Sequence, residues 1–138
     1  MAASSASSGR LRVAVVGATG YTGAELVRLV AGHPHTELVA LVEHATAGEP
    51  IERVVESLRS VLGGEVRPYD PAALAEAADA VFCALPHGAS APKVAQLRAA
   101  GLTVFDLSAD FRLTDLAVYR DWYGEHAAPE RLSEAVYG

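Results

Sequence analysis

Along the chain, short uninterrupted apolar runs alternate with stretches in which apolar residues recur every three or four positions. Continuous apolar runs are typical of parallel strands covered on both faces, whereas the second pattern is typical of amphipathic helices. Strands are therefore predicted at residues 11–16, 38–42, near 66, 80–85 and 103–107. Helices are predicted at residues 20–31, 51–62, 72–78, 90–100, 114–123 and, for a turn or two, 129–135. Strands that alternate with helices predict an α/β fold, in which helices cross over a parallel sheet.

Capping and turn residues support several of these boundaries. Gly32 follows the first predicted helix, at a position where a left-handed residue is common. Asp70 precedes Pro71, which is the pattern of an N-cap followed by a first-turn proline. Thr114 is expected to cap the last long helix and Gly124 to end it.

Composition narrows the class of protein. The 138 residues are 51% hydrophobic and 20% charged, which fits one folded domain and excludes a disordered chain. The net charge of −6 argues against a nucleic-acid partner, and no apolar run approaches the roughly 20 residues of a membrane span. The single cysteine excludes an internal disulfide and suits a reducing compartment, so we expect a cytoplasmic protein without a membrane partner.

The N-terminal residues differ from the rest of the chain. Residues 1–10 are mainly Met, Ala, Ser and Gly, and they are predicted to form a flexible tail. A transit peptide is the alternative, and only Arg10 supports it. Residues 11–138 contain neither an internal repeat nor a linker, and we interpret them as one domain.

The strongest chemical signal is a set of three glycines, spaced G-x-x-G-x-x-G, where the first strand leads into the first helix. Gly17 suits the tight turn, Gly20 would let a diphosphate approach the backbone, and Gly23 would let the helix pack against the strand. Free N–H groups at a helix N-terminus attract phosphate. The intervening candidates for cofactor binding are Thr19, Tyr21 and Thr22. A glycine-rich turn without a ligand is the alternative.

Glu43 is the second indication of a dinucleotide. It follows the second predicted strand about 20 residues after Gly23, where an acidic residue binds the hydroxyl groups of an adenosine ribose. A carboxylate there repels a 2′-phosphate, so Glu43 taken alone favours NAD over NADP. The alternative is a solvated glutamate at the end of a strand.

Several motifs in a fixed order resemble the N-terminal part of N-acetyl-gamma-glutamyl-phosphate reductase, an enzyme family of arginine biosynthesis. The motifs are GATGYTG at residues 17–23, LPHG at 85–88, DLSADFRL at 106–113, YGEH at 123–126 and AVYG at 135–138. The resemblance covers residues 11–138. The combination of LPHG with DLSADFRL is far more specific than the glycine pattern, which many nucleotide-binding proteins share.

The resemblance implies a Rossmann-type, doubly wound parallel sheet with helices on both faces, which binds NADP. In the family, a separate domain performs catalysis and dimerisation. A cysteine thiolate there converts an acyl phosphate to a thioester, which hydride from NADPH reduces to a semialdehyde. Acyl-phosphate substrate and a homo-oligomer are therefore expected only for the full-length enzyme.

Family members are more than twice as long, and their nucleophilic cysteine lies in a Gly-Cys segment beyond the motifs found here. We therefore expect residues 11–138 to be a truncated cofactor-binding part, without a catalytic residue and inactive by itself. No metal is expected. A C-terminal helix of the family returns to cover this domain, so its absence is expected to leave an apolar patch exposed.

The preference between the two nicotinamide dinucleotides stays open. Relatives often carry Ser and Arg in the loop after the second strand, where they suit a 2′-phosphate. Here residues 43–48 contain Thr46, which would donate to a phosphate, and His44, which would add charge when protonated, but no Arg. The resemblance favours NADP, and NAD is the alternative.

Two loops follow strands at the predicted carboxyl edge of the sheet, where ligands of open α/β folds bind. The resemblance implies that the loop of Pro86, His87 and Gly88 lies near the nicotinamide. The alternative is an exposed turn. The second loop contains the substrate-binding candidates Ser108 and Arg112.

The guanidinium of Arg112 would hold a phosphate or carboxylate through two parallel N–H bonds. The alternative is a structural pair of Asp110 with Arg112 that fixes the loop and contacts no substrate.

Two further groups have structural interpretations. Cys83 lies within an apolar run, so it is expected to be buried and inert with a raised pKa. The aromatic residues Tyr119, Trp122 and Tyr123 have helical spacing and are expected to pack rather than to form a stacking platform.

Three other functions are alternatives to this interpretation. The aminoadipyl-phosphate reductase of lysine biosynthesis shares the DLSADFRL and YGEH stretches, and AVYG tilts the comparison toward the arginine enzyme. Aspartate-semialdehyde dehydrogenase shares the glycine turn but lacks LPHG and DLSADFRL. A dinucleotide-binding module without catalytic activity is the alternative outside the enzymes.

Overall fold

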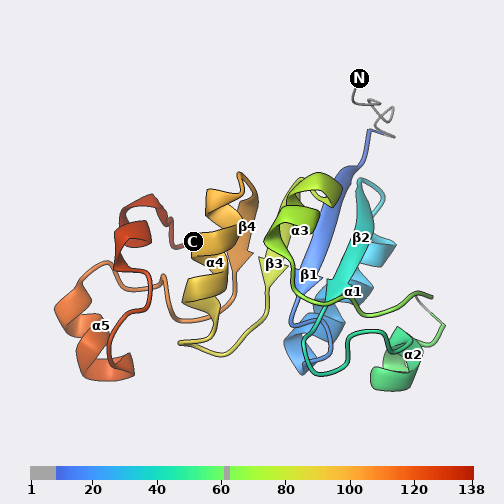
Figure 1. Ribbon diagram of the computed structural model, residues 1–138, viewed down its shortest axis with the longest axis horizontal. Helices are drawn as coiled ribbons and strands as arrows, with labels where there is room; N and C mark the ends of the chain where they lie inside the picture. The colour runs from blue at the N-terminus through green and yellow to red at the C-terminus, as the bar shows by residue number, and fades with distance from the viewer. Residues whose placement is uncertain (1–8, 61–62) are drawn as a thin grey trace.

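The structure is a computed structural model in which residues 9–60 and 63–138 are described. Its centre is a parallel sheet of four strands in the order β2-β1-β3-β4 (Figure 1). The strands are β1 (Leu11–Val16), β2 (Thr36–Val42), β3 (Ala80–Cys83) and β4 (Thr103–Asp106). All four match predicted runs, and the predicted flexible tail lies mostly outside the described residues.

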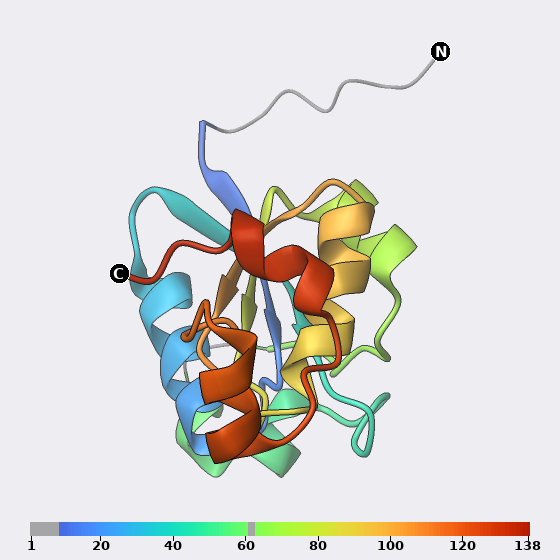
Figure 2. The ribbon, with the colours of Figure 1, turned by 90° about the vertical axis from the view of Figure 1, so that its left-hand side faces the viewer.

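Helices cover both faces of the sheet, as the doubly wound arrangement requires (Figures 1 and 2). The α-helices are α1 (Tyr21–Gly32), α2 (Ile51–Val54), α3 (Pro71–Ala77), α4 (Ser90–Ala99) and α5 (Leu116–Tyr123). Two 3₁₀ turns, η1 (Glu56–Leu58) and η2 (Pro129–Glu134), complete the described elements. The last helix, α5, lies beyond the β4 end of the sheet (Figure 1).

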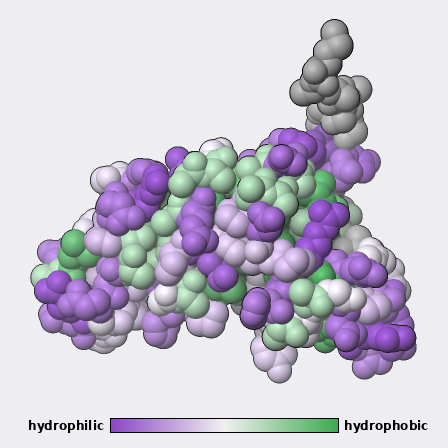
Figure 3. All heavy atoms as spheres, viewed as in Figure 1, coloured by the Kyte–Doolittle hydropathy of each residue, from purple (hydrophilic) through white to green (hydrophobic). Residues whose placement is uncertain are grey.

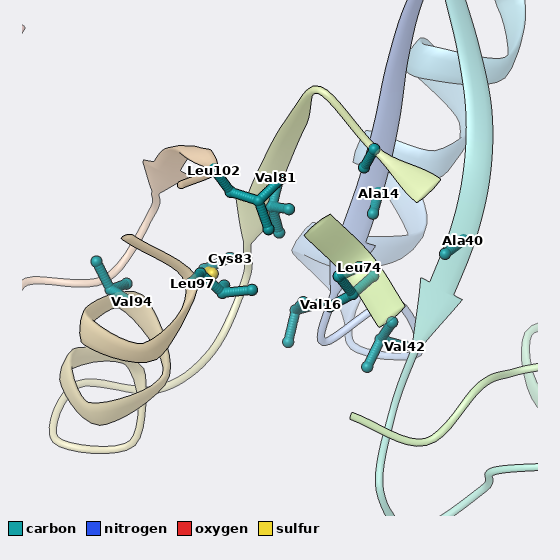
Figure 4. Close-up of a cluster of buried hydrophobic side chains, with 11 residues drawn as sticks. Ala14, Val16, Ala40, Val42, Leu74, Val81, Cys83, Val94, Leu97 and Leu102 are labelled. Atoms are coloured by element: carbon teal, nitrogen blue, oxygen red, sulfur yellow. The ribbon is translucent and has the colours of Figure 1, made fainter. Parts of the chain in front are cut away.

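Alternate residues of the strands enter two separate cores. In β1, Val16 contributes to the core under α3 and α4, whereas Val15 contributes to the core under α1 and α2. Figure 4 shows the first core, in which Leu74 of α3 and Leu97 of α4 lie among strand residues such as Val81. Because successive strand side chains point to opposite faces, a continuous apolar run fills both cores.

The predicted helix at residues 51–62 is wrong in its length. It ends after four residues, and Val55 is extended (φ −130°, ψ 93°) before η1 begins. Two consecutive β-branched valines favour extended backbone, and the break places both Ile51 and Leu58 in the core under α1. Val61 and Leu62 lie outside the described residues.

Other boundaries differ by smaller amounts. The strand expected near Val66 is reduced to two isolated bridges, in which Arg67 pairs with Val42 and Glu65 with Pro50. The cap of α5 is Asp115 rather than Thr114, because the Asp115 carboxylate accepts bonds from two backbone N–H groups of the first turn. The predicted cap at Asp70 and the end of α5 at Gly124 are confirmed.

Candidate cofactor-binding site

The glycine-rich turn joins β1 to α1 through an unusually close approach of backbone to backbone. Gly17 has φ +81°, and a Cβ added there would lie 2.5 Å from the carbonyl oxygen of Ala84. A Cβ at Gly23 would overlap the carbonyl oxygen of Gly17, so α1 packs directly on the turn. These two glycines are therefore required by the fold itself.

Gly20 stands apart from the other two glycines. Its backbone is extended (φ −73°, ψ 167°), and the nearest atom to an added Cβ would be the Gly17 oxygen at 3.7 Å, an ordinary contact. The fold thus tolerates a side chain at Gly20. Within the described part of the chain, no side chain caps α1, and Tyr21 and Thr22 at its start are exposed. The N-terminus of α1 therefore presents backbone donors next to an open surface at Gly20.

Glu43 is held beside this turn. Its Oε2 accepts a hydrogen bond from Thr19 Oγ1 (3.1 Å), and its Oε1 accepts one from the backbone N–H of His44 (2.9 Å). The structure thus brings Glu43 together with the glycine-rich turn, as the spacing predicts, and the carboxylate is half-buried there.

The rest of the loop after β2 differs from the prediction in one respect. The hydroxyl of Thr46 is buried and has no hydrogen-bond partner among the described residues, so it does not face the solvent as a phosphate donor would. His44 is exposed.

The loop of Pro86, His87 and Gly88 lies at the carboxyl end of β3, as predicted. Gly88 has φ +79° with open space around its Cα, so backbone conformation rather than crowding requires glycine there. Its N–H donates to Asp110 Oδ1 at 2.7 Å. The ring of the exposed His87 lies 5.5 Å from the ring of Tyr123, centroid to centroid.

Asp110 is the principal residue whose role the sequence did not reveal. Its side chain is completely buried, and besides Gly88 it accepts hydrogen bonds from the Ala91 N–H (Oδ2, 2.8 Å) and the Tyr119 hydroxyl (Oδ1, 2.8 Å). No ion pair in the described chain includes Asp110, so the alternative of a pair with Arg112 is wrong. The carboxylate points instead to the N-terminus of α4, where the helix dipole and three donors stabilise it.

His126 adds a further contact to the same residue. Its Nδ1 accepts a bond from the Ala128 N–H (3.0 Å), so its Nε2 carries the hydrogen and donates to the backbone oxygen of Asp110 (2.6 Å). The centre of the Tyr119 ring lies 4.6 Å from that of the His126 ring. Burial of the Tyr119 hydroxyl and, to a smaller extent, its hydrogen bond to Asp110 raise the pKa of Tyr119 to about 12. Asp110 therefore connects the loop at Gly88, helix α4 and the segment around α5.

The two substrate-binding candidates differ in their environment. Ser108 donates through Oγ to Asp106 Oδ2 (2.7 Å) and accepts from the Asp110 N–H (3.1 Å), so its hydroxyl is used to fix the turn. Arg112 is exposed, and its guanidinium carbon lies 5.7 Å from the centre of the Tyr137 ring. Of the two, Arg112 retains free donors toward a ligand.

A groove of about 740 Å³ runs along β4, and Arg112 is part of its lining. Phe105, Leu107 and Tyr137 line it with about half or more of their surfaces exposed. An exposed apolar patch, as predicted, is therefore present at the end of the sheet. On the face seen in Figure 3, hydrophobic residues are interspersed with hydrophilic ones.

Cys83 is buried in β3. Burial and, to a smaller extent, the negative charge of the nearby Asp106 raise the pKa of its thiol to about 12. The predictions of burial and of a raised pKa are thus confirmed. The prediction of packed aromatic residues is confirmed for Tyr119, which is 2% exposed, but it is wrong for Trp122, which is 77% exposed. Trp122 lies on the outer side of α5, because only one face of this short helix meets the rest of the fold.

Across residues 9–60 and 63–138, no helix is both long and apolar enough to cross a membrane. The same residues contain no group of three or more His, Cys, Asp or Glu side chains that would hold a metal ion.

A parallel sheet with a glycine-rich turn after its first strand, an uncapped helix behind it and an acidic residue after its second strand defines a Rossmann-type dinucleotide-binding domain. The family described as semialdehyde dehydrogenase, NAD binding domain, matches residues 12–138. The chain belongs to this family.

Curated relatives agree with this assignment. N-acetyl-gamma-glutamyl-phosphate reductase from Nitrosococcus oceani is 48% identical over 129 residues, which are 93% of this chain and 38% of the relative. The enzyme of that name from Heliobacterium modesticaldum is 50% identical over 93% of this chain and 37% of the relative. The [LysW]-L-2-aminoadipate/[LysW]-L-glutamate phosphate reductase of Saccharolobus solfataricus is 44% identical over 94% and 37%. The chain thus spans less than two fifths of these relatives.

Among solved structures, aspartate semialdehyde dehydrogenase with NADP from Candida albicans is similar, with a TM-score of 0.66. It is 22% identical, and the match covers 75% of this chain and 31% of that one. At this identity the likeness establishes the shared fold.

Proposed function

We propose that this chain is the cofactor-binding part of an NADPH-dependent N-acetyl-gamma-glutamyl-phosphate reductase, which acts in arginine biosynthesis in the cytoplasm. In this role, the N-terminus of α1 and the open surface at Gly20 bind the diphosphate. Glu43, oriented by Thr19, binds the adenosine ribose, and the loop of Pro86, His87 and Gly88 lies against the nicotinamide.

The bound dinucleotide supplies the hydride that reduces the acyl group. The residues of this chain bind it and orient it. They do not supply the nucleophile, because the one cysteine is buried and its pKa is raised to about 12. We therefore propose that the acyl phosphate reacts only in a full-length enzyme, which we expect to be a homo-oligomer, and that this chain alone shows no turnover with acyl phosphate and NADPH.

The identity to the arginine enzyme supports this choice of pathway. The Saccharolobus reductase, with a different substrate in its name, is less similar at 44% than the Nitrosococcus enzyme at 48%. We retain lysine biosynthesis as the second candidate, since its motifs overlap with those of this chain.

The observation that carries the proposal is the open surface at Gly20. Gly20→Ala adds a methyl group that meets no protein atom closer than 3.7 Å, so the variant is expected to fold like the wild type. The methyl group would occupy the space of the diphosphate, so the Kd for NADPH is expected to rise about tenfold or more.

Calorimetric titration of the purified chain with NADPH and NADH measures this effect. Gly32→Ala is the matched control, because a Cβ there meets nothing within 4 Å and the residue lies at the far end of α1. Equal affinity of Gly20→Ala and wild type would contradict the proposed diphosphate site.

A further inference from the structure

In the loop that leads into α4, every backbone N–H group from Gly88 to Ala91 donates a hydrogen bond. The carbonyl oxygen of Pro86 accepts from residues 89 and 90, both at 3.2 Å. The Asp110 carboxylate accepts from the other two, at 2.7 Å from Gly88 and 2.8 Å from Ala91. Half of these donors therefore depend on a side chain that comes from a different loop.

The two sides of the loop differ in exposure. Residues 86–89 are exposed, whereas the side chain of Asp110 is completely buried. The carboxylate is itself fixed by the Tyr119 hydroxyl, which donates to it at 2.8 Å. Its backbone is fixed as well, because the Asp110 N–H donates to Ser108 and its carbonyl oxygen accepts from His126. The loop thus has a fixed inner side and an outer side that is open to a ligand.

The same carboxylate makes the N-termini of α1 and α4 unequal as sites for an anion. No side chain caps α1 within the described part of the chain, but Asp110 already places a negative charge at the N-terminus of α4. A second anion there would be repelled. A diphosphate is therefore directed to α1, and the loop before α4 is suited to an uncharged part of the ligand, such as a reduced nicotinamide.

We propose that Asp110 is a positioning residue, whose carboxylate holds residues 86–88 in the conformation that receives the nicotinamide half of the cofactor. This inference rests on the proposed cofactor function. Gly88 has φ +79°, and the bond from its N–H to Asp110 selects this conformation among those that glycine can adopt. If the loop adopts the binding conformation for only a fraction of the time, the apparent affinity falls by that fraction.

The test compares Asp110→Asn with the wild type in calorimetric titrations with NADPH and with 2′-phospho-ADP-ribose, which is the same molecule without its nicotinamide. Asparagine offers an acceptor to only one of the N–H groups of Gly88 and Ala91. We expect the Kd for NADPH to rise about tenfold and the Kd for 2′-phospho-ADP-ribose to stay unchanged. NADH and ADP-ribose form a second pair for the same comparison.

Two control variants separate positioning from a general loss of stability. Tyr119→Phe removes one partner of Asp110 but leaves both bonds to the loop, so each Kd should stay close to that of the wild type. Leu102→Ala opens a cavity in the core just before β4, at the opposite edge of the sheet from the loop. Its Tm should fall, whereas each Kd of the folded protein should not change.

Gly88→Ala tests the same loop with Asp110 left in place. The added methyl group meets nothing within 4 Å, but the positive φ disfavours a side chain. This variant should therefore show the same selective loss of affinity for NADPH, and it decides the question if Asp110→Asn does not fold.

The outcomes distinguish this inference from the proposed function. The role of Asp110 would be overturned if its replacement weakened NADPH and 2′-phospho-ADP-ribose equally, or weakened neither. It would also be overturned if Leu102→Ala showed the same selective loss, if Gly88→Ala showed none, or if the wild type bound NADPH no more tightly than 2′-phospho-ADP-ribose. Failure of the wild type to bind any of the four ligands would instead contradict the proposed function.

Discussion

Replacing Asp110 by asparagine tests whether this buried carboxylate organises the edge of the sheet. Asparagine has the same shape, but one of its two terminal groups donates hydrogen bonds instead of accepting them. If the amide nitrogen faces Ala91, two N–H groups oppose each other there. If it faces Gly88, the same conflict occurs at the loop. In either orientation, a backbone N–H that donates to the carboxylate loses its partner.

The magnitude follows from these contacts. A hydrogen bond to a charged group contributes about 1.5–3 kcal/mol, and an unpaired buried donor costs about 1–3 kcal/mol. Because these contributions overlap, Asp110→Asn should lower the free energy of unfolding by about 2–4 kcal/mol. Domains of this size are stable by about 5–15 kcal/mol, so the variant should still fold.

The assay is urea denaturation followed by circular dichroism, since the exposed Trp122 makes its fluorescence a poor reporter of unfolding. Tyr119→Phe is the control. It removes one donor from Asp110 and leaves the bonds to Gly88 and Ala91, so it should cost about 1.5 kcal/mol. A loss for Asp110→Asn no larger than that for Tyr119→Phe would refute the role given to the carboxylate.

Three further predictions concern the interior. Gly23→Ala, unlike the change at Gly20, should fail to fold or lose much of its stability to urea, because its Cβ would overlap the Gly17 oxygen. Cys83 should not react with a thiol reagent at pH 8 until the chain is denatured, and rapid labelling of the native protein would contradict its burial. Since Cys83 and Tyr119 have pKa values raised to about 12, the fold favours their neutral forms. The contribution of these two groups to the free energy of unfolding should therefore be fully present below about pH 9 and be lost as the pH rises toward 12, which urea titrations from pH 8 upward will measure.

The sheet could be predicted from the sequence because its strands are buried on both faces. Each of the four lies in a largely apolar run, and such a run can be recognised in the sequence without knowing which strands lie beside it. The helix at residues 51–62 could not be predicted in the same way. Its apolar spacing is helical, but the positions of Ile51 and Leu58 in one core are reached through an extended Val55, which depends on tertiary packing.

The parts of the site formed by residues close together in the sequence could be predicted. The parts formed by residues far apart in the sequence could not. The roles of Gly17 and Gly23 follow from a strand-to-helix turn a few residues long. Asp110, by contrast, receives donors from residues 9 to 22 positions away, and no spacing rule covers such a set.

Because β4 is the last strand of the sheet in the described part of the chain, its outer backbone groups form an open row there beside apolar side chains such as Phe105 and Leu107. Such a row is a template on which an extended peptide of another molecule adds as an extra strand. Concentrated preparations of this chain should therefore self-associate through the outer edge of β4. A lysine introduced at Thr103, an exposed position on the same strand, is the simplest means of keeping samples monodisperse.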